Sequence, residues 1–391
     1  MTKIFLFLTI LLAPLYVVRF NIGPYPSTLL EVLIGLTVVS WVFEKFKNRD
    51  FKLPSSIFHL PIILFLAAAA ISVAVSPDKR GALGIFKAYL IEPLLIYLVI
   101  KDVVKSKKDW WLVFYALILS GLWVALLAVF QGLTGWLTFA PHEAALGRAH
   151  AVYNTANAVG LYLGPIVFLV LGTVREFRVF RAFGIVLMIL AIVLSKSTGA
   201  MVGLGAAALF FILYPSFPKK LVVRVCGVIG LVLAVVGILF FFNISRFIPE
   251  VGDPYVREST DTLQFRFCLW EGARDLILDK PIFGAGLSGF KELYAEKYFT
   301  CDAEPLEYPH NWILNFWTEM GVLGLVGFLL LLAMYFRNIR SRLSDKRTRW
   351  LALGFSAAMI YWLIHGLVDV PYFKNDLALE FWVILGLLET F

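Results

Sequence analysis

Charged side chains are scarce in this sequence. Asp, Glu, Lys and Arg make up 16% of its 391 residues, whereas hydrophobic side chains make up 60% and the mean hydropathy is +0.83. Soluble domains have about a quarter of their residues charged. The composition therefore excludes soluble, disordered, collagen-like and nucleic-acid-binding classes, and it predicts an integral membrane protein.

Cysteine is also sparse, with three residues in the chain. Cys226 falls inside an apolar stretch, where we expect it to act as a small apolar side chain. Cys268 and Cys301 share a hydrophilic segment that we place outside the cytoplasm, where the surroundings can be oxidising. The sequence leaves a disulfide and two free thiols open for this pair, because spacing does not establish disulfide geometry.

The patterns of metal and nucleotide sites are missing. The five histidines show no i, i+4 spacing and no adjoining Cys-x-x-Cys, although His142 and His150 fall in one predicted loop. The glycine-rich piece 284–286 is not followed by the Lys-Ser/Thr of a phosphate-binding loop. We therefore predict no metal, no cofactor and no nucleotide-activated donor.

Long apolar stretches dominate what is present. Each helix needs about 20 mainly apolar residues to cross the hydrocarbon region of a bilayer. Twelve such stretches have the predicted bounds 3–20, 28–46, 57–75, 82–100, 110–130, 151–172, 179–195, 198–214, 221–243, 311–336, 349–368 and 375–390. The predicted fold class is an all-α polytopic membrane protein of about 12 transmembrane helices. The first stretch lacks a convincing cleavage site of small residues, so we expect it to be retained.

Basic residues indicate the orientation. With Lys3, the short loops at 45–52, 101–108, 175–181, 219–224 and 337–349 hold 21 of the 35 Lys and Arg residues, and all fall on one side. Short cytoplasmic loops carry such an excess. We therefore expect both termini to be cytoplasmic.

One predicted connection is long. Residues 244–309 separate helices 1–9 (1–243) from helices 10–12 (311–391), and they carry 12 acidic and seven basic side chains. Within them, Thr262–Asp279 places apolar side chains at steps of three and four, which predicts an amphipathic helix at the membrane surface. A second short helix is predicted at 290–299. We expect one integrated membrane domain whose chemistry takes place in this extracytoplasmic loop.

The tenth predicted span begins with Pro309, His310 and Asn311, and Pro is a helix start signal. We expect His310 on the first turn at the outer face, where the positive end of the helix dipole disfavours an imidazolium. A neutral imidazole is what a general base requires. Gly321 and Gly324 follow by about three and four turns, so we expect both near the histidine's face, where a neighbouring helix could approach.

A polar stripe follows on the same predicted helix, formed by Asn311, Asn315 and Thr318, with Glu319 beside it. Polar groups inside a bilayer are costly and usually face a partner or a cavity. The stripe is explained by hydrogen bonds between helices or by a role in a site, and the sequence leaves both open.

These motifs resemble a known family. His310-Asn311, nine residues, then Gly321 and Gly324 are similar to the His-Asn, nine-spacer, Gly-x-x-Gly pattern of O-antigen ligases and the related O-antigen polymerases. Three further stretches are similar to that family: Arg266 and Trp270 with Pro281-Ile282-Phe283-Gly284-Ala285-Gly286 and Phe290; Gly147-Arg148 with Asn154 to Gly160; and His365-Gly366-Leu367-Val368-Asp369. The resemblance covers roughly residues 140–390.

The chain departs from the family at Ser195–Gly199, where Thr198 stands in place of a common arginine. Lys196 on the same predicted turn is the candidate substitute. The alternative is that Lys196 extends to lipid head groups.

The resemblance implies a GT-C-like, inverting, metal-independent glycosyltransferase. It would move a glycan from undecaprenyl pyrophosphate to a hydroxyl of a lipid or glycan acceptor, such as lipid A-core, at the periplasmic face of the bacterial inner membrane. The implied site residues are His310 as general base; Arg266, Arg148, Arg274 and Lys196 on the pyrophosphate; and Asn311, Gly321, Gly324 and Asp369 in support. Guanidinium groups suit a leaving group that gains negative charge. Arg274 has an alternative, an ion pair with Asp275, Glu271 or Asp279.

Other functions stay open at the level of sequence. Within the family, an O-antigen polymerase or a protein O-oligosaccharyltransferase would share the donor and differ in the acceptor. From other classes, twelve helices also suit a transporter of lipid-linked glycans or a non-catalytic membrane partner. Transporters usually show related halves and ionisable groups near the bilayer midplane, whereas the polar residues here gather in one asymmetric loop, which favours an enzyme.

Overall fold

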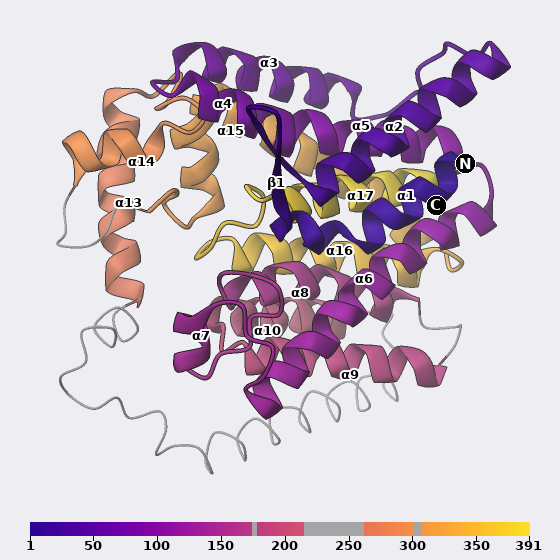
Figure 1. Ribbon diagram of the computed structural model, residues 1–391. Coiled ribbons are helices and arrows are strands. Elements are labelled where there is room, and N and C mark those ends of the chain that lie inside the picture. Colours follow the sequence, from indigo (N-terminus) through magenta and orange to yellow (C-terminus); the bar gives the residue numbers. More distant parts are fainter. Residues whose placement is uncertain (174–177, 215–261, 300–305) are drawn as a thin grey trace.

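The computed structural model describes residues 1–173, 178–214, 262–299 and 306–391. This part of the chain is helical apart from one two-stranded antiparallel hairpin, so the predicted all-α class is confirmed. Figure 1 shows most of the long helices running in a similar direction, with both termini at the same end of the bundle. The predicted span at 221–243 lies outside the described residues.

The first half of the chain contributes most of the outer helices. Its elements are α1 Thr2–Leu11, the 3-10 turn η1 Ala13–Val17, β1 Arg19–Ile22, β2 Tyr25–Thr28, α2 Leu29–Asn48, α3 His59–Val75, α4 Lys79–Ile85, the π-helix η2 Phe86–Ile91, α5 Glu92–Val103, α6 Lys107–Thr134, α7 Pro141–Ala145 and α8 Asn157–Gly172. Strand β1 pairs with β2 in the register Arg19 to Thr28.

The second half carries the helices that surround the site. Its elements are α9 Arg178–Leu194, α10 Thr198–Leu213, α13 Thr262–Asp279, α14 Phe290–Leu293, the π-helix η4 Tyr294–Tyr298, α15 Trp312–Ser344, α16 Arg349–His365 and α17 Asn375–Thr390. The predicted helix at Thr262–Asp279 is confirmed as α13. The predicted short helix at 290–299 is found as α14 followed by η4.

The first predicted span, 3–20, is wrong in its second half. Helix α1 ends at Leu11, and the 3-10 turn that follows contains Pro14. Proline lacks the backbone N–H that a continuing helix needs. The chain then enters the exposed hairpin strand β1.

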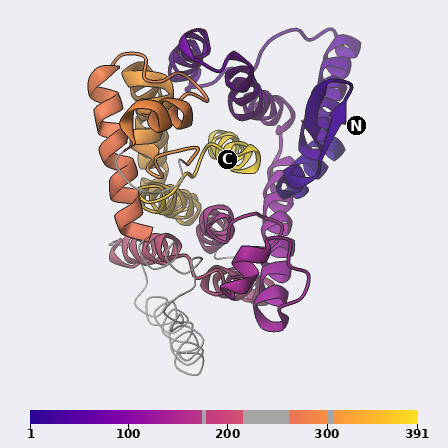
Figure 2. The same cartoon turned by 60° about the vertical axis from the view of Figure 1, so that its left-hand side comes forward.

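Helix α17 forms the centre of the bundle. Figure 2 shows it near the middle of the molecule with the other helices around it. Every residue from Asn375 to Leu388 is buried, because α17 meets neighbours on all sides rather than on one stripe. The loop between α16 and α17 therefore joins two helices of the core.

By length and composition, three described helical segments could cross a membrane: Lys79–Val103, Lys107–Thr134 and Trp312–Ser344. Five shorter apolar helices have 10 to 17 residues: Thr2–Leu11, His59–Val75, Asn157–Gly172, Arg181–Leu194 and Thr198–Leu213. Twelve spans therefore remain a prediction.

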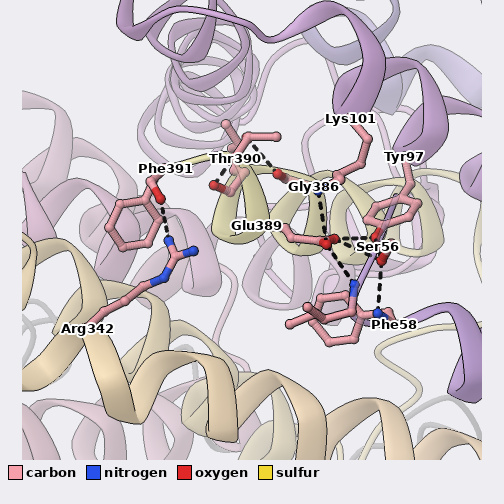
Figure 3. A network of polar contacts seen from close by, with 11 residues as sticks. Ser56, Phe58, Tyr97, Lys101, Arg342, Gly386, Glu389, Thr390 and Phe391 are labelled. Carbon is pink, nitrogen blue, oxygen red and sulfur yellow. Dashed lines mark hydrogen bonds and ion pairs between the residues drawn. The ribbon is translucent and has the colours of Figure 1, made fainter. Parts of the chain in front are cut away.

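A polar network fixes the end of the bundle where the termini lie. Glu389 on α17 pairs with Lys101 at 3.0 Å and accepts hydrogen bonds from Tyr97 and from Ser56 (Figure 3). Arg342 at the end of α15 donates to the carbonyl of Phe391 over 2.6 Å. The basic groups of this end belong to or adjoin loops that the charge pattern predicts to be cytoplasmic, whereas α13 and α14 lie at the opposite end in Figure 1.

Candidate functional site

Asn311 fixes the start of α15. Its Oδ1 accepts hydrogen bonds from the backbone N–H groups of Ile313 and Leu314, at 3.0 and 3.2 Å, which makes it the N-cap. Its Nδ2 donates to the carbonyl of Leu367 over 3.0 Å, and Trp312 N donates to the carbonyl of Gly366 over 2.8 Å. These bonds tie the start of α15 to the chain that follows α16.

His310 lies just before this cap, in a left-handed backbone conformation with φ of 51°. Such a conformation is uncommon for a residue with a side chain and is often held in place at functional sites. It turns the imidazole toward the α16–α17 loop, where Nδ1 lies 3.3 Å from Oδ1 of Asp369. The His310 side chain is 27% exposed, so the ring is accessible as well as oriented.

The predicted place of His310 on the first helical turn is therefore wrong. Asn311 occupies the cap and takes the free N–H groups, so the helix dipole is not the main influence on the imidazole. The charged group in contact with the imidazole is the carboxylate of Asp369, whose Oδ1 lies 3.3 Å from Nδ1.

Asp369 is held ionised. Burial alone would raise the pKa of its carboxyl group, but the hydrogen bond and charge of His310, together with His365 and Lys374, outweigh burial and lower the pKa well below its usual range. Its Oδ1 also accepts a hydrogen bond from Val370 N at 2.8 Å. The buried carboxylate can therefore orient the His310 ring and stabilise a proton on it.

Helix α13 brings Arg266 to the same place. Trp270, one turn after Arg266, donates its indole N–H to the carbonyl of Pro309 over 2.9 Å. Arg266 is also within electrostatic reach of His365, the last residue of α16. The Nε atom of Arg266 is buried without a hydrogen-bond partner among the described residues. A guanidinium N–H without a partner is available to an anionic ligand.

Gly321 does not serve as the predicted approach point for a helix. It has φ of 65° and ψ of −174°, which interrupt α15, and a Cβ there would lie 1.9 Å from the carbonyl oxygen of Ile282. The loop after α13 docks at this break: Val322 N donates to the carbonyl of Pro281 over 3.1 Å, and Ala285 N to that of Thr318 over 2.6 Å. Glycine is required here by both the backbone angle and the contact.

At Gly324, too, the nearest described atoms do not come from a neighbouring helix, contrary to the prediction. A Cβ at this position would lie 2.2 Å from Cβ of Met320, which is brought close by the break in the helix. Counting turns from His310 across Gly321 does not work, because a face continues only along an unbroken helix.

The polar stripe has a structural explanation in part. Glu319 accepts hydrogen bonds from the backbone N–H groups of Ser288, at 2.6 Å, and Phe290, at 3.2 Å, so it holds the loop before α14. Thr318 donates to the carbonyl of Asn315 at 3.3 Å. Neither side-chain atom of Asn315 has a partner among the described residues, although the residue is fully buried.

Arg148 and Lys196 form a second cationic pair near the N-terminal ends of α8 and α10. Arg148 pairs with Glu143 at 3.0 Å and donates to Oδ1 of Asn157 over 2.7 Å and to the carbonyl of Ser195 over 3.1 Å. Lys196 Nζ donates to the carbonyl of Leu146 over 3.0 Å. Burial and then the charge of Arg148 lower the pKa of Lys196.

These two cations lie near the same end of α16. A Cβ at Gly160, one turn after Asn157, would lie 3.3 Å from His365, and one at Gly199, three residues after Lys196, would lie 2.8 Å from it. The sequence did not indicate Glu143, which half-neutralises the pair. No spacing or motif marks it, because its partnership with Arg148 depends on the turn after α7.

Arg274 does not join the other candidate cations of the site. Its guanidinium is exposed and makes two hydrogen bonds to Oδ1 of its neighbour Asp275, at 3.0 and 2.9 Å. This is one of the ion-pair alternatives that the sequence left open. Among the described residues, no His, Cys, Asp and Glu side chains gather as a group that could hold a metal ion.

Cys268 is disulfide-bonded. Cys226 and Cys301 both lie outside the described residues, so the pairing of Cys268 with Cys301 remains a prediction.

Residues 183–329 match the sequence model of a family described as O-antigen ligase. The match covers Lys196, Arg266, His310, Gly321 and Gly324. The chain carries an O-antigen ligase domain. The domain match ends before Asp369, so the contact of Asp369 with His310 comes from the described structure rather than from the family comparison.

Two of the curated relatives that this chain resembles are named polysaccharide ligases. A protein of Rickettsia conorii named "putative polysaccharide ligase" is 26% identical over 192 residues, 46% of this chain and 43% of that protein. A protein of the same name from Rickettsia typhi is 23% identical over 235 residues, 57% of this chain and 53% of that protein. An uncharacterised protein of Haemophilus influenzae is 28% identical over 166 residues, 38% of this chain and 41% of that protein.

This chain thus spans about half the length of the curated relatives it matches. Its apolar helices, together with the O-antigen ligase match at residues 183–329, indicate a bacterial membrane protein.

Proposed function

We propose that this chain is a glycosyltransferase of the ligase type that moves a glycan from undecaprenyl pyrophosphate to an acceptor hydroxyl. The observation that carries the proposal is the placement of a partly exposed imidazole, His310, on a buried carboxylate, Asp369, beside the helix that bears Arg266. The O-antigen ligase domain supports the same reaction class.

His310 would act as the general base. Its Nδ1 faces Asp369, so Nε2 is the nitrogen left to take the proton of the acceptor hydroxyl. The hydroxyl oxygen then attacks the anomeric carbon while the bond from that carbon to the pyrophosphate oxygen breaks, with inversion. The negative charge of Asp369 stabilises the imidazolium that forms, as a buried carboxylate does for a catalytic histidine.

Arg266 would bind the pyrophosphate. Negative charge grows on the leaving group in the transition state, so a fixed guanidinium lowers the barrier more than it strengthens ground-state binding. The partnerless Nε–H of Arg266 supports this role. Arg148 and Lys196 would add positive potential from the neighbouring helix ends, with Arg148 partly neutralised by Glu143.

The proposed location is the inner membrane of a bacterial cell. We propose that the site lies at the periplasmic face of the inner membrane, with both termini in the cytoplasm, because Lys101, Arg342 and the termini fall at the end of the bundle opposite α13 and α14. The acceptor would be a lipid or a glycan such as lipid A-core, and membrane lipids would surround the helices. A polymerase or a protein O-oligosaccharyltransferase would use the same residues with another acceptor.

Reconstitution tests the proposal. Purified protein in liposomes is given a glycan on undecaprenyl pyrophosphate together with a panel of lipid, glycan and peptide acceptors. We expect a covalent product with one acceptor class and a loss of about 10²–10⁴-fold in His310→Ala, the usual contribution of a general base. The control is His59→Ala, an exposed histidine at the start of α3.

Two outcomes would reject the proposal. Near-normal turnover by His310→Ala would remove His310 from the mechanism. Movement of the lipid-linked glycan between leaflets, with no covalent product for any acceptor, would instead identify a transporter.

A further inference from the structure

Tyr361 and His365 lie one turn apart on α16 and are both fully buried. Four glycines make room for them, two on α8 and two on α10. A Cβ at Gly164 would lie 1.9 Å from the Tyr361 ring, and one at Gly203 would lie 3.0 Å from it. A Cβ at Gly199 would lie 2.8 Å from His365. The two rings are therefore fixed in a slot that tolerates no larger neighbour.

Hydrogen bonds in this slot determine where His365 carries its proton. Tyr361 donates its hydroxyl hydrogen to the carbonyl of Gly160 over 2.7 Å. The same hydroxyl oxygen lies 3.1 Å from Nδ1 of His365. Since a hydroxyl has one hydrogen, its oxygen must accept from Nδ1, and the neutral ring of His365 carries its hydrogen there. Nε2 of His365 then holds a lone pair.

That lone pair faces Asp369. Nε2 of His365 has no hydrogen-bond partner in the described part of the chain, and Oδ2 of Asp369 lies 3.9 Å from it. Oδ1 of the same carboxylate contacts His310. Asp369 thus lies between two imidazoles, His310, which is partly exposed, and His365, which is buried. Its negative charge can stabilise a proton on either ring.

Charged groups near His365 include Arg148 and Lys196 at the ends of α8 and α10, but two others act on it most directly. Arg266 of α13 opposes a proton on His365, and Asp369 attracts one. Helices α8 and α10 carry no charged side chains, and the hydroxyl of Tyr162 on α8 bonds to Ser120 of α6 instead. Protonation of His365 therefore acts mainly on Asp369.

We propose that His365 is a positioning residue for the transfer reaction, and that it controls His310 through Asp369. When His365 is neutral, the negative charge of Asp369 is available to stabilise a proton on His310 alone. Once protonated, it turns Nε2 into a donor to Oδ2 and competes for that charge, which weakens the support for a proton on His310. This inference rests on the proposed function, because it concerns the basicity of the same His310.

The pH dependence of kcat/KM in liposomes tests it. Because a proton on His310 removes the base and a proton on His365 withdraws support from it, we expect the logarithm of kcat/KM to fall with a slope approaching two at acid pH in the wild type. In His365→Asn, whose amide can still donate to Tyr361 but reaches no further, we expect a slope of one. The control His59→Asn should keep the wild-type slope.

A second substitution distinguishes an effect of His365 through Asp369 from a purely structural role of its side chain. Gln matches the size of His better than Asn does, so a purely structural role predicts that His365→Gln is the milder change. We expect the reverse: the longer amide reaches Asp369 permanently, so its plateau kcat/KM should be lower than that of His365→Asn. An unchanged acid slope in His365→Asn, or a milder effect of His365→Gln, would overturn the inference while leaving His310 as the base.

Nitrogen NMR of labelled histidines gives a readout that does not depend on turnover. We expect Nδ1 of His365 to carry the hydrogen at neutral pH, and Nε2 to gain one at acid pH in the wild type. A hydrogen on Nε2 at neutral pH would contradict the inference. If no variant transfers glycan, the proposed function fails, and this spectrum still decides whether His365 is arranged as described.

Discussion

The indole N–H of Trp270 donates to the carbonyl of Pro309 over 2.9 Å, although 39 residues separate them in the chain. This bond joins the surface helix α13 to the residue just before His310. Because Arg266 lies one turn earlier on α13, the bond also sets where its guanidinium stands relative to the imidazole. A mobile segment could not hold two catalytic groups at a fixed separation.

Two arginines of α13 offer a matched comparison. We expect Arg266→Gln to lower kcat by about 10²–10³-fold, since it removes a fixed donor to the leaving pyrophosphate. Arg266→Lys should recover part of the loss, because it restores the charge but not the planar fork. Arg274→Gln should stay near wild type, because Arg274 is exposed and bound to Asp275. Equal losses at the two positions would count against a specific clamp.

Gly321 should be the least replaceable glycine of α15. In Gly321→Ala the new Cβ would collide with the backbone of Ile282, and the backbone angle itself costs about 1–3 kcal/mol for a residue other than glycine. We expect a lower midpoint of thermal unfolding in detergent. Gly205→Ala on α10 is the control, since a Cβ added there would have no described atom within 4 Å; it should be neutral or slightly stabilising.

Asp369 should stay ionised throughout the range in which the protein is assayed. Its pKa in the folded chain lies below its unfolded value of about 3.9, so its contribution to stability is complete above that pH and is lost as the pH falls through the folded pKa. Unfolding midpoints of the wild type and Asp369→Asn should therefore differ at least as much at pH 5 as at pH 8. A difference that shrinks over this range would mean that Asp369 itself titrates there.

The disulfide of Cys268 predicts a defined product of peptide mapping. We expect a non-reduced digest to contain one linked pair, Cys268 with Cys301, and a free Cys226. Reduction should lower the unfolding midpoint, since losing a native disulfide commonly costs about 2–5 kcal/mol. A link between Cys268 and Cys226 would refute the pairing and the placement of Cys226 inside a span.

Chelation should leave transfer intact. In the proposed mechanism Arg266, Arg148 and Lys196 supply the positive charge on the pyrophosphate, so we expect full turnover after treatment with EDTA. Loss of activity that Mg²⁺ restores would show that a divalent cation shares this task.

Helix positions were largely predictable from sequence. Apolar stretches bounded by charges, Pro or Gly located α2, α3, α6, α9, α10, α16 and α17 to within a few residues, and period 3.6 located α13. The main failure came at residues 12–20, where apolar character continues but the backbone leaves the helix near Pro14. Hydropathy measures the preference of side chains for lipid or water. It does not depend on the backbone N–H that Pro14 lacks.

For the candidate site, the sequence predicted which residues take part but not which residues they contact. The resemblance to O-antigen ligases, together with the departure from it at Ser195–Gly199, singled out His310, Arg266, Arg148, Lys196 and Asp369 as candidates. Their partners were decided by the fold: Asn311 rather than His310 caps α15, Gly321 breaks the helix to admit a loop, and Asp369 meets two histidines. Contacts between residues far apart in the chain depend on how helices pack and where the backbone turns, and neither quantity is encoded in any single segment.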